Sequence, residues 1–169
     1  NQTGSLPRFV LGASMGGSAV IHAIHEGMDL DGLILLDPQL DIVDSLMKGG
    51  EIVTGLPSFL FTVAVRTAVW RYGLPTGRRN PLLLGSKLQL PILLIQDWED
   101  PVTRSQFAQR LANINPWVDL TRVPPIQPND ICIEGKERWG SHVAAHSCHP
   151  IWTQDTIKNF TLSVIAASK

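Results

Sequence analysis

The sequence predicts an α/β fold, in which a mostly parallel sheet is flanked by helices. Short apolar runs alternate with segments of helical spacing along most of the 169 residues. Two of these runs, within 32–37 and 91–97, are almost continuously apolar, as strands buried on both faces require. The apolar share of 44% is enough for a sizeable core in one domain.

The strands and helices follow from these patterns in chain order. The predicted strands cover residues 8–13, 32–37 and 91–97, and a last strand covers 119–123 or 130–134. The predicted helices cover 15–26, with Gly27 as a stop, then 103–115, ending before Pro116, and finally 153–167. We expect all three helices to pack on the sheet.

The alternation breaks between residues 39 and 88, where a single crossover helix would be enough to join two strands. We predict a helical lid insertion over 39–88, and a core made of 1–38 and 89–169. Within the insertion, Pro57 suits a first helical turn and Gly73 a helix stop. Its four arginines could meet an anionic substrate, but a solvated basic face is the simpler explanation; they are Arg66, Arg71, Arg78 and Arg79.

The composition narrows the possible partners. With 14 basic and 15 acidic residues, the chain has no charge excess that would favour nucleic acid, so we expect a small-molecule partner. Arg66 interrupts the longest apolar stretch well before the ~20 residues of a membrane span. Cys132 and Cys148 are too few for a disulfide scaffold, and we expect two buried or idle thiols. The compartment is left open, with a cytoplasmic location favoured.

One serine, Ser14, stands in the stretch GASMGG, between a predicted strand and a predicted helix. A nucleophilic serine needs an exposed hydroxyl, a base and donors for the developing oxyanion. Gly12 and Gly16, two residues before and after it, leave room for the strained turn of a nucleophile elbow. The Met15 amide, at the start of the helix, is placed to donate to the oxyanion. We predict Ser14 as the nucleophile, and an idle serine in a glycine-rich turn as the alternative.

A carboxylate and an imidazole must then come later in the chain. The loop after the strand 91–97 holds Asp97 and Asp100 at the carboxyl edge of the sheet, beside the serine turn. We predict Asp100 as the acid and keep Asp97 as the second choice. For the base, the stretch RWGSHVAAHSCH offers three histidines. We predict His142, which lies in a loop-like stretch before the last helix, with His146 and His149 flanking it.

These segments together resemble the α/β-hydrolase family over nearly the whole chain. The matching stretches are VLGASMGG, GLILLDP, LLIQDWEDPVT and GSHVAAH, in the family's order. The resemblance implies that the strands are the fifth to eighth of the family's sheet. It also implies that Ser14, Asp100 and His142 act as a catalytic triad without a cofactor or metal. Carboxylic esters are the expected substrates, with thioesters, lactones, amides and acyl transfer left open.

The sequence departs from this family in two places. The Asp100-to-His142 separation is longer than expected, and PPIQPND looks like an insertion near the last strand. About four strands of the family, with the loop that gives a second oxyanion donor, have no counterpart before residue 8. We therefore expect the chain to be the carboxyl-terminal part of a longer protein, with that missing part or a second chain completing the sheet.

Three other functions compete with this one. A nucleotide-binding domain would use GASMGG as a variant of G-x-G-x-x-G and Asp37 as a ribose-binding acid, but the Ser14 side chain would obstruct the pyrophosphate. A metal site would draw on His142, His146, Cys148 and His149, although Val143 stands where a metalloprotease motif has its glutamate. The third is a non-catalytic protein, either a hydrolase-like fold used only for binding or a hydrolase fragment with no activity of its own.

Overall fold

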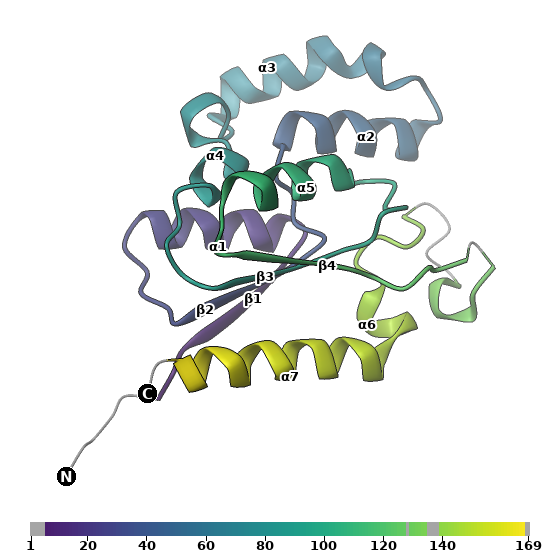
Figure 1. Cartoon of the computed structure of the whole chain (residues 1–169). Helices are drawn as coiled ribbons and strands as arrows, with labels where there is room; N and C mark the ends of the chain where they lie inside the picture. The colour runs from purple at the N-terminus through teal and green to yellow at the C-terminus, as the bar shows by residue number, and fades with distance from the viewer. Residues whose placement is uncertain (1–5, 128, 135–138, 168–169) are drawn as a thin grey trace.

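Four strands form one parallel sheet that lies between the helices of the molecule (Figure 1). The computed structural model describes residues 6–127, 129–134 and 139–167. The strands are β1 (Phe9–Ala13), β2 (Gly32–Leu36), β3 (Ile92–Gln96) and β4 (Val118–Arg122), and they lie side by side in this order. Leu35 pairs with Gly12 on one side and with Leu94 on the other. Because every pair is parallel, the carboxyl ends of all four strands meet at one edge.

The two inner strands are buried on both faces, as their apolar sequences predict. Every residue of β2 and β3 is buried. At the edge of the sheet, β4 is only partly buried, which explains why its sequence is more polar. The predicted strand at 119–123 is therefore present, displaced by one residue. The alternative at 130–134 is wrong, since Ile131–Ile133 forms a short 3-10 helix, η3.

Helices cover both faces of the sheet (Figure 1). On one face lie α1 (Met15–His25), α4 (Pro81–Gly85) and α5 (Ser105–Ile114), and on the other α7 (Pro150–Ala167). Two apolar clusters fill these layers, one around Ile21, Leu35 and Leu111 and one around Ile34 and Ile95. The last helix begins three residues before its predicted start, because Pro150 is suited to a first helical turn.

The segment between β2 and β3 is helical and contains α2 (Ile42–Thr54), η1 (Ser58–Phe61), α3 (Thr62–Tyr72), η2 (Gly77–Arg79) and α4. Its helices α2 and α3 lie above the layer that α1, α4 and α5 form on the sheet (Figure 1). The Asp41 carboxylate caps α2 by accepting from the Asp44 amide at 2.9 Å. The sequence predicts one helix between Pro57 and Gly73, whereas the structure has η1 followed by α3; Gly73 ends α3 at a φ of 61°. An ion pair between Arg104 and Asp44 ties α2 to the start of α5.

The expectation of two idle thiols is wrong. Cys132 and Cys148 form a disulfide that joins η3 to α6 (Ala145–Cys148), with Cα atoms 5.0 Å apart. The error arises because pairing depends on spatial proximity, which a count of two cysteines does not contain. His142 lies in the chain between the two cysteines, so the disulfide closes the loop that carries this residue.

Among the described residues, no single helix is long and apolar enough to cross a membrane. One pair, Ile42–Thr54 with Ser58–Tyr72, reaches the required length and composition only when taken together, and the pair is bent by 116°.

Candidate active site

Ser14 occupies a strained turn between β1 and α1. Its φ of 49° and ψ of −121° lie in a region that residues with a side chain rarely adopt. Backbone hydrogen bonds hold the turn: the Ser14 amide donates to the Leu36 carbonyl, and the Ser14 carbonyl accepts from the Gly17 and Gln39 amides. The Met15 amide follows at the first position of α1, where a backbone N–H has no partner inside the helix. The turn is thus fixed by β2 and by the residues after it.

Close packing explains one of the two predicted small residues. A Cβ atom at Gly12 would lie 2.7 Å from the Gly17 Cα and 2.9 Å from the Gly16 carbonyl oxygen, so only glycine fits there. A Cβ at Gly16 would meet no atom of the described residues within 4 Å. The second close approach is at Gly17, where a Cβ would lie 3.0 Å from the Pro38 Cβ. The sequence predicts that the second small residue is needed at Gly16, whereas the structure needs it at Gly17.

The structure brings Ser14, His142 and Asp100 into one hydrogen-bonded chain. His142 Nε2 lies 2.9 Å from Ser14 Oγ, and His142 Nδ1 lies 2.7 Å from Asp100 Oδ2. In the tautomer that carries its proton on Nδ1, the ring donates to Asp100, and Nε2 accepts from the Ser14 hydroxyl. The Asp100 side chain is fully buried and the His142 side chain is 12% exposed, so water only weakly screens the interaction between them.

Asp100 is held in place by its own loop. Its Oδ1 atom accepts from the Val102 and Thr103 amides at 2.7 and 2.9 Å. Its Oδ2 atom also accepts from the Thr103 hydroxyl at 2.7 Å. Together with the His142 bond, these donors fix the orientation of the Asp100 carboxylate.

Asp97, the second choice for the acid, has a different position. Its Oδ1 atom accepts from the Glu99 amide at 3.0 Å. Its Oδ2 atom is buried and has no hydrogen-bond partner among the residues that the structure describes. It makes no hydrogen bond to His142, whose Nδ1 is bonded to Asp100 instead. Of the two candidates, the structure thus joins only Asp100 to the histidine.

A third buried carboxylate, Asp37, supports the site from behind. Its Oδ1 atom accepts from the Asp97 amide at 2.7 Å, and its Oδ2 atom from the Val143 amide at 3.2 Å. It therefore connects the ends of β2 and β3 to the residue after His142. Burial first, and then the neighbouring Asp100 carboxylate, raise the pKa of Asp37 well above its ordinary value.

Sequence reasoning considered Asp37 only as a ribose-binding acid and missed this supporting position. The signal was its place directly after the continuously apolar run GLILL, where a charged side chain must enter a buried edge. With no exposed surface and both oxygens bonded to backbone amides, Asp37 is not available to a ribose. The hydrogen bond between Ser14 and His142 likewise does not fit a phosphate-binding turn.

The two flanking histidines lie apart from the serine. His149 Nε2 lies 3.1 Å from the Pro124 carbonyl oxygen, to which it can donate, and His146 is exposed in α6. His142 stands in a turn before α6, so it does not share a helix face with His146. No group of three or more histidine, cysteine, aspartate or glutamate side chains that could hold a metal occurs in the described parts of the chain.

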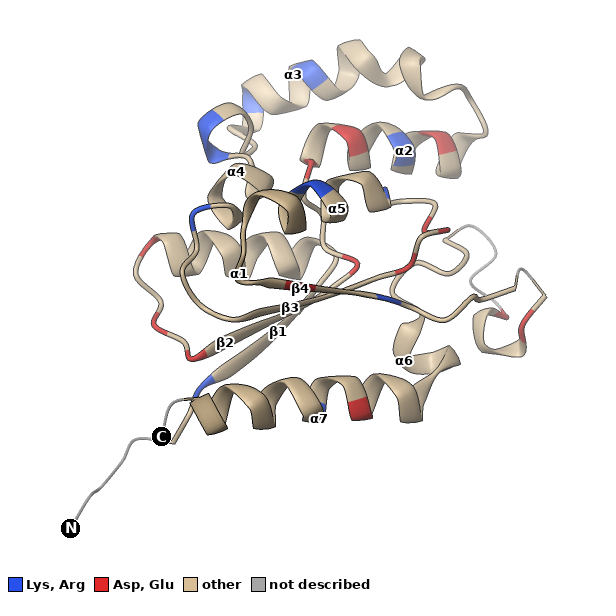
Figure 2. Cartoon of the chain, viewed as in Figure 1, with Lys and Arg blue, Asp and Glu red and all other residues tan. Residues whose placement is uncertain are grey.

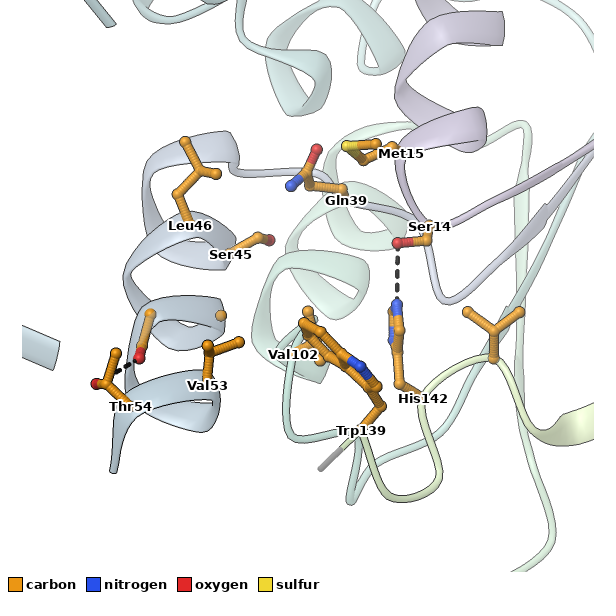
Figure 3. A pocket seen from close by; sticks show the side chains of 13 residues that line it. Ser14, Met15, Gln39, Ser45, Leu46, Val53, Thr54, Val102, Trp139 and His142 are labelled. Carbon is orange, nitrogen blue, oxygen red and sulfur yellow. Dashed lines mark hydrogen bonds between the residues drawn. The ribbon is translucent and has the colours of Figure 1, made fainter. Parts of the chain in front are cut away.

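An apolar cavity of about 850 Å³ opens beside Ser14 and His142 (Figure 3). One wall is a face of α2, which contributes Leu46, Gly49 and Val53. Met15, Val102 and Trp139 line it from other elements. Among the described residues, the lining contains no lysine, arginine, aspartate or glutamate, and the Gln39 amide is one of its few polar groups. Such a cavity suits an uncharged, mainly apolar molecule.

Comparison with known structures identifies the fold. The esterase Pf2001 of Pyrococcus furiosus matches 90% of this chain at 20% identity, with a TM-score of 0.61. MGS-MChE2, an α/β hydrolase from a lagoon-sediment metagenome, matches 92% at 20% identity and a TM-score of 0.56, and the match spans 61% of its own chain. BpoC of Mycobacterium tuberculosis matches 94% at 15% identity and a TM-score of 0.57, over 68% of its own chain.

These likenesses show that the chain has the α/β-hydrolase fold, as the sequence resemblance implied. The chain spans about half the length of the Pyrococcus esterase, since 52% of that protein is matched. No protein-family model matches the sequence, and a search of curated proteins found no similar sequence.

Proposed function

We propose that this chain carries the catalytic residues of a serine hydrolase that cleaves carboxylic esters through an acyl-enzyme on Ser14. The observation that carries the proposal is the chain of hydrogen bonds from Asp100 through His142 to Ser14, at 2.7 and 2.9 Å, beside an apolar cavity. The fold that the chain has in common with an esterase supports it. In this proposal, Ser14 is the nucleophile of an elbow and residues 39–88 are a lid.

In the first half-reaction, Ser14 Oγ attacks the carbonyl carbon of the ester while His142 Nε2 takes the hydroxyl proton. The carbonyl oxygen becomes an oxyanion, and the Met15 amide donates to it. The positive charge that forms on the His142 ring is stabilised by the Asp100 carboxylate, to which the ring donates through Nδ1. The C–O bond to the alcohol then breaks, the alcohol leaves with the proton from His142, and the acyl group remains on Ser14.

In the second half-reaction, a water molecule replaces the alcohol. His142 Nε2 takes a proton from the water, whose oxygen attacks the acyl carbon of the ester on Ser14. Collapse of this intermediate breaks the bond to Ser14 Oγ, and His142 returns the proton to the serine. The net reaction consumes one water and releases the alcohol and the carboxylic acid, and it needs no cofactor or metal.

The cavity supports an apolar acyl group as the part of the substrate next to Ser14. Each methylene group that moves from water into such a cavity contributes about 0.8 kcal/mol to binding. Gly49 on α2 leaves room along the cavity wall, since a Cβ atom there would meet no described atom within 4 Å. We therefore propose that α2, which forms this wall, helps to select esters by the length of their acyl chain.

The test is the hydrolysis of p-nitrophenyl esters by the protein and by three alanine variants. Ser14→Ala and His142→Ala are expected to lower kcat by at least about a thousandfold, because each removes a group that takes part directly in the chemistry. The control is His146→Ala, which removes an exposed imidazole of the same stretch and should retain activity within about threefold. Equal losses in all three variants, or none, would overturn the proposal.

A further inference from the structure

Large apolar side chains face solvent on the outer side of the segment between β2 and β3. They lie in the turn before η1, in η1 and in α3: Leu56, Phe59, Leu60, Val63 and Trp70. Trp70 is 82% exposed and Val63 is 76% exposed. Single exposed apolar residues are ordinary on a protein surface, but a continuous group of them marks a site of interaction.

The period of α3 separates this outer side from an inner one. Val63, Thr67 and Trp70 are four and three residues apart, so they share one face of the helix, and all three are exposed. Val65, which is buried, and Val69, which is partly buried, point the other way. Figure 1 shows α3 as the outermost helix, stacked on α2. Packing inside the molecule therefore accounts for the inner side of α3 and leaves the outer side without a function.

The segment that carries this outer side is cationic. Residues 52–96 hold five basic side chains and no acidic one, whereas the rest of the sequence holds nine basic and fifteen acidic side chains. Four of the five are Arg66 and Arg71 in α3 and Arg78 and Arg79 in η2. Figure 2 shows α3 and η2 with basic positions and without acidic ones. None of these arginines belongs to an ion pair with any residue that the structure describes.

We propose that this outer face, formed by η1, α3 and η2, docks on the surface of an anionic lipid bilayer. Its apolar residues would enter the boundary between headgroups and acyl chains, where tryptophan and tyrosine are favoured. The arginines are complementary in charge to anionic headgroups, which attract each basic side chain near the surface. Aliphatic side chains such as Val63 and Leu56 have no aromatic face for stacking on bases, so the face suits a bilayer better than a nucleic acid.

This inference does not depend on the proposed esterase activity, because none of its residues belongs to the hydrogen-bonded chain at Ser14. The test therefore uses binding, not turnover. The protein is sedimented with phosphatidylcholine vesicles that contain about 30% phosphatidylglycerol, and in parallel with pure phosphatidylcholine vesicles. We expect at least about tenfold tighter binding to the anionic vesicles, weakened when the salt is raised to about 1 M.

Paired variants test whether the face itself binds. Arg66→Glu combined with Arg71→Glu is expected to weaken binding by more than about twentyfold, since each lost arginine corresponds to about fivefold. Trp70→Ala should weaken binding and remove the blue shift of tryptophan fluorescence on vesicle addition. The matched controls are Arg110→Glu in α5 and Ile151→Ala in α7, which change exposed residues elsewhere and should bind as the unaltered protein does.

Three results would overturn the proposal. The first is equal binding to both kinds of vesicle, or equal loss in the controls and in the variants of the face. The second is a concentration-dependent dimer that Trp70→Ala abolishes, without vesicle binding, because a second copy would then cover the face. The third is binding of a single-stranded oligonucleotide in place of vesicles. Circular dichroism of every variant verifies that a loss of binding is not a loss of folding.

Discussion

Replacing Asp100 by asparagine tests how the site orients its histidine. The Oδ2 atom of Asp100 accepts hydrogen bonds from His142 Nδ1 and from the Thr103 hydroxyl, both at 2.7 Å. The Oδ1 atom accepts from two backbone amides and needs an oxygen in its place. In Asp100→Asn the amide oxygen keeps the position of Oδ1, so an NH₂ group faces His142. The ring must then carry its proton on Nε2, which can no longer take the Ser14 proton.

The size of the effect follows from burial. The Asp100 side chain is fully buried and that of His142 is 12% exposed, so the charged ring of the transition state and the carboxylate form a nearly buried pair. Removing one partner of such a pair costs about 3–5 kcal/mol. A loss of this size in the transition state corresponds to a decrease of about two to four orders of magnitude in kcat. Binding of the ester, measured by KM, should change little, because the positive charge on the His142 ring forms only in the transition state.

The assay is the hydrolysis of a p-nitrophenyl ester by Asp100→Asn and by Asp97→Asn. Asp97 is a matched control because it is also buried and stands three residues earlier, and its Oδ2 atom has no partner among the described residues. We expect Asp97→Asn to retain activity within about fivefold. A larger loss in Asp97→Asn than in Asp100→Asn would refute the reasoning, and so would full activity of Asp100→Asn.

Three further predictions concern the surroundings of the site. Replacing both Cys132 and Cys148 by serine opens a cross-link between residues 16 apart and should lower the free energy of unfolding by about 3 kcal/mol, measured with urea; an unchanged value would contradict the disulfide. Gly49→Leu should lower kcat/KM at least about tenfold for an octanoate ester but not for an acetate ester, because the new side chain enters the cavity; equal effects on both esters would contradict this. The raised pKa of Asp37 means that the folded chain keeps a proton that the unfolded chain loses above the ordinary value of 3.8, so the stabilisation from Asp37 falls as pH rises. The advantage in unfolding free energy of the unaltered protein over Asp37→Asn should thus be larger near about pH 4 than near about pH 7, and an advantage that grows with pH would contradict the direction of the shift.

The sequence was informative where the local pattern alone decides the structure. The apolar runs of β2 and β3 predict buried parallel strands because their neighbours on both faces are also apolar. The order of Ser14, Asp100 and His142 along the chain indicated which three residues could meet, because the carboxyl ends of parallel strands lie at one edge. What these residues do stays a prediction until activity is measured.

The sequence was less informative where a contact joins distant segments. Gly12 and Gly16 were both expected to be required, but the close approach involves Gly17, whose neighbour Pro38 follows β2. The pairing of Cys132 with Cys148 depends on how η3 and α6 meet, which no local spacing encodes. The supporting position of Asp37 likewise required knowing that the amide of Val143 reaches the end of β2.

The choice between Asp97 and Asp100 shows the limit of loop prediction. Both follow β3, and either could reach a histidine if the loop had another shape. The two backbone amides that bind Asp100 Oδ1 turn the other oxygen toward His142, and this arrangement depends on the path of the loop rather than on residue types. Sequence patterns could therefore name the candidates but not orient them.

Reaction with a fluorophosphonate probe, followed by mass spectrometry of the labelled peptide, tests directly whether the hydroxyl at the strand-to-helix turn is activated. The account predicts one label, on Ser14, that is absent from Ser14→Ala and strongly slowed in His142→Ala, because the imidazole at 2.9 Å takes the hydroxyl proton. Labelling that persists in Ser14→Ala, or none in a protein shown to be folded, would contradict it.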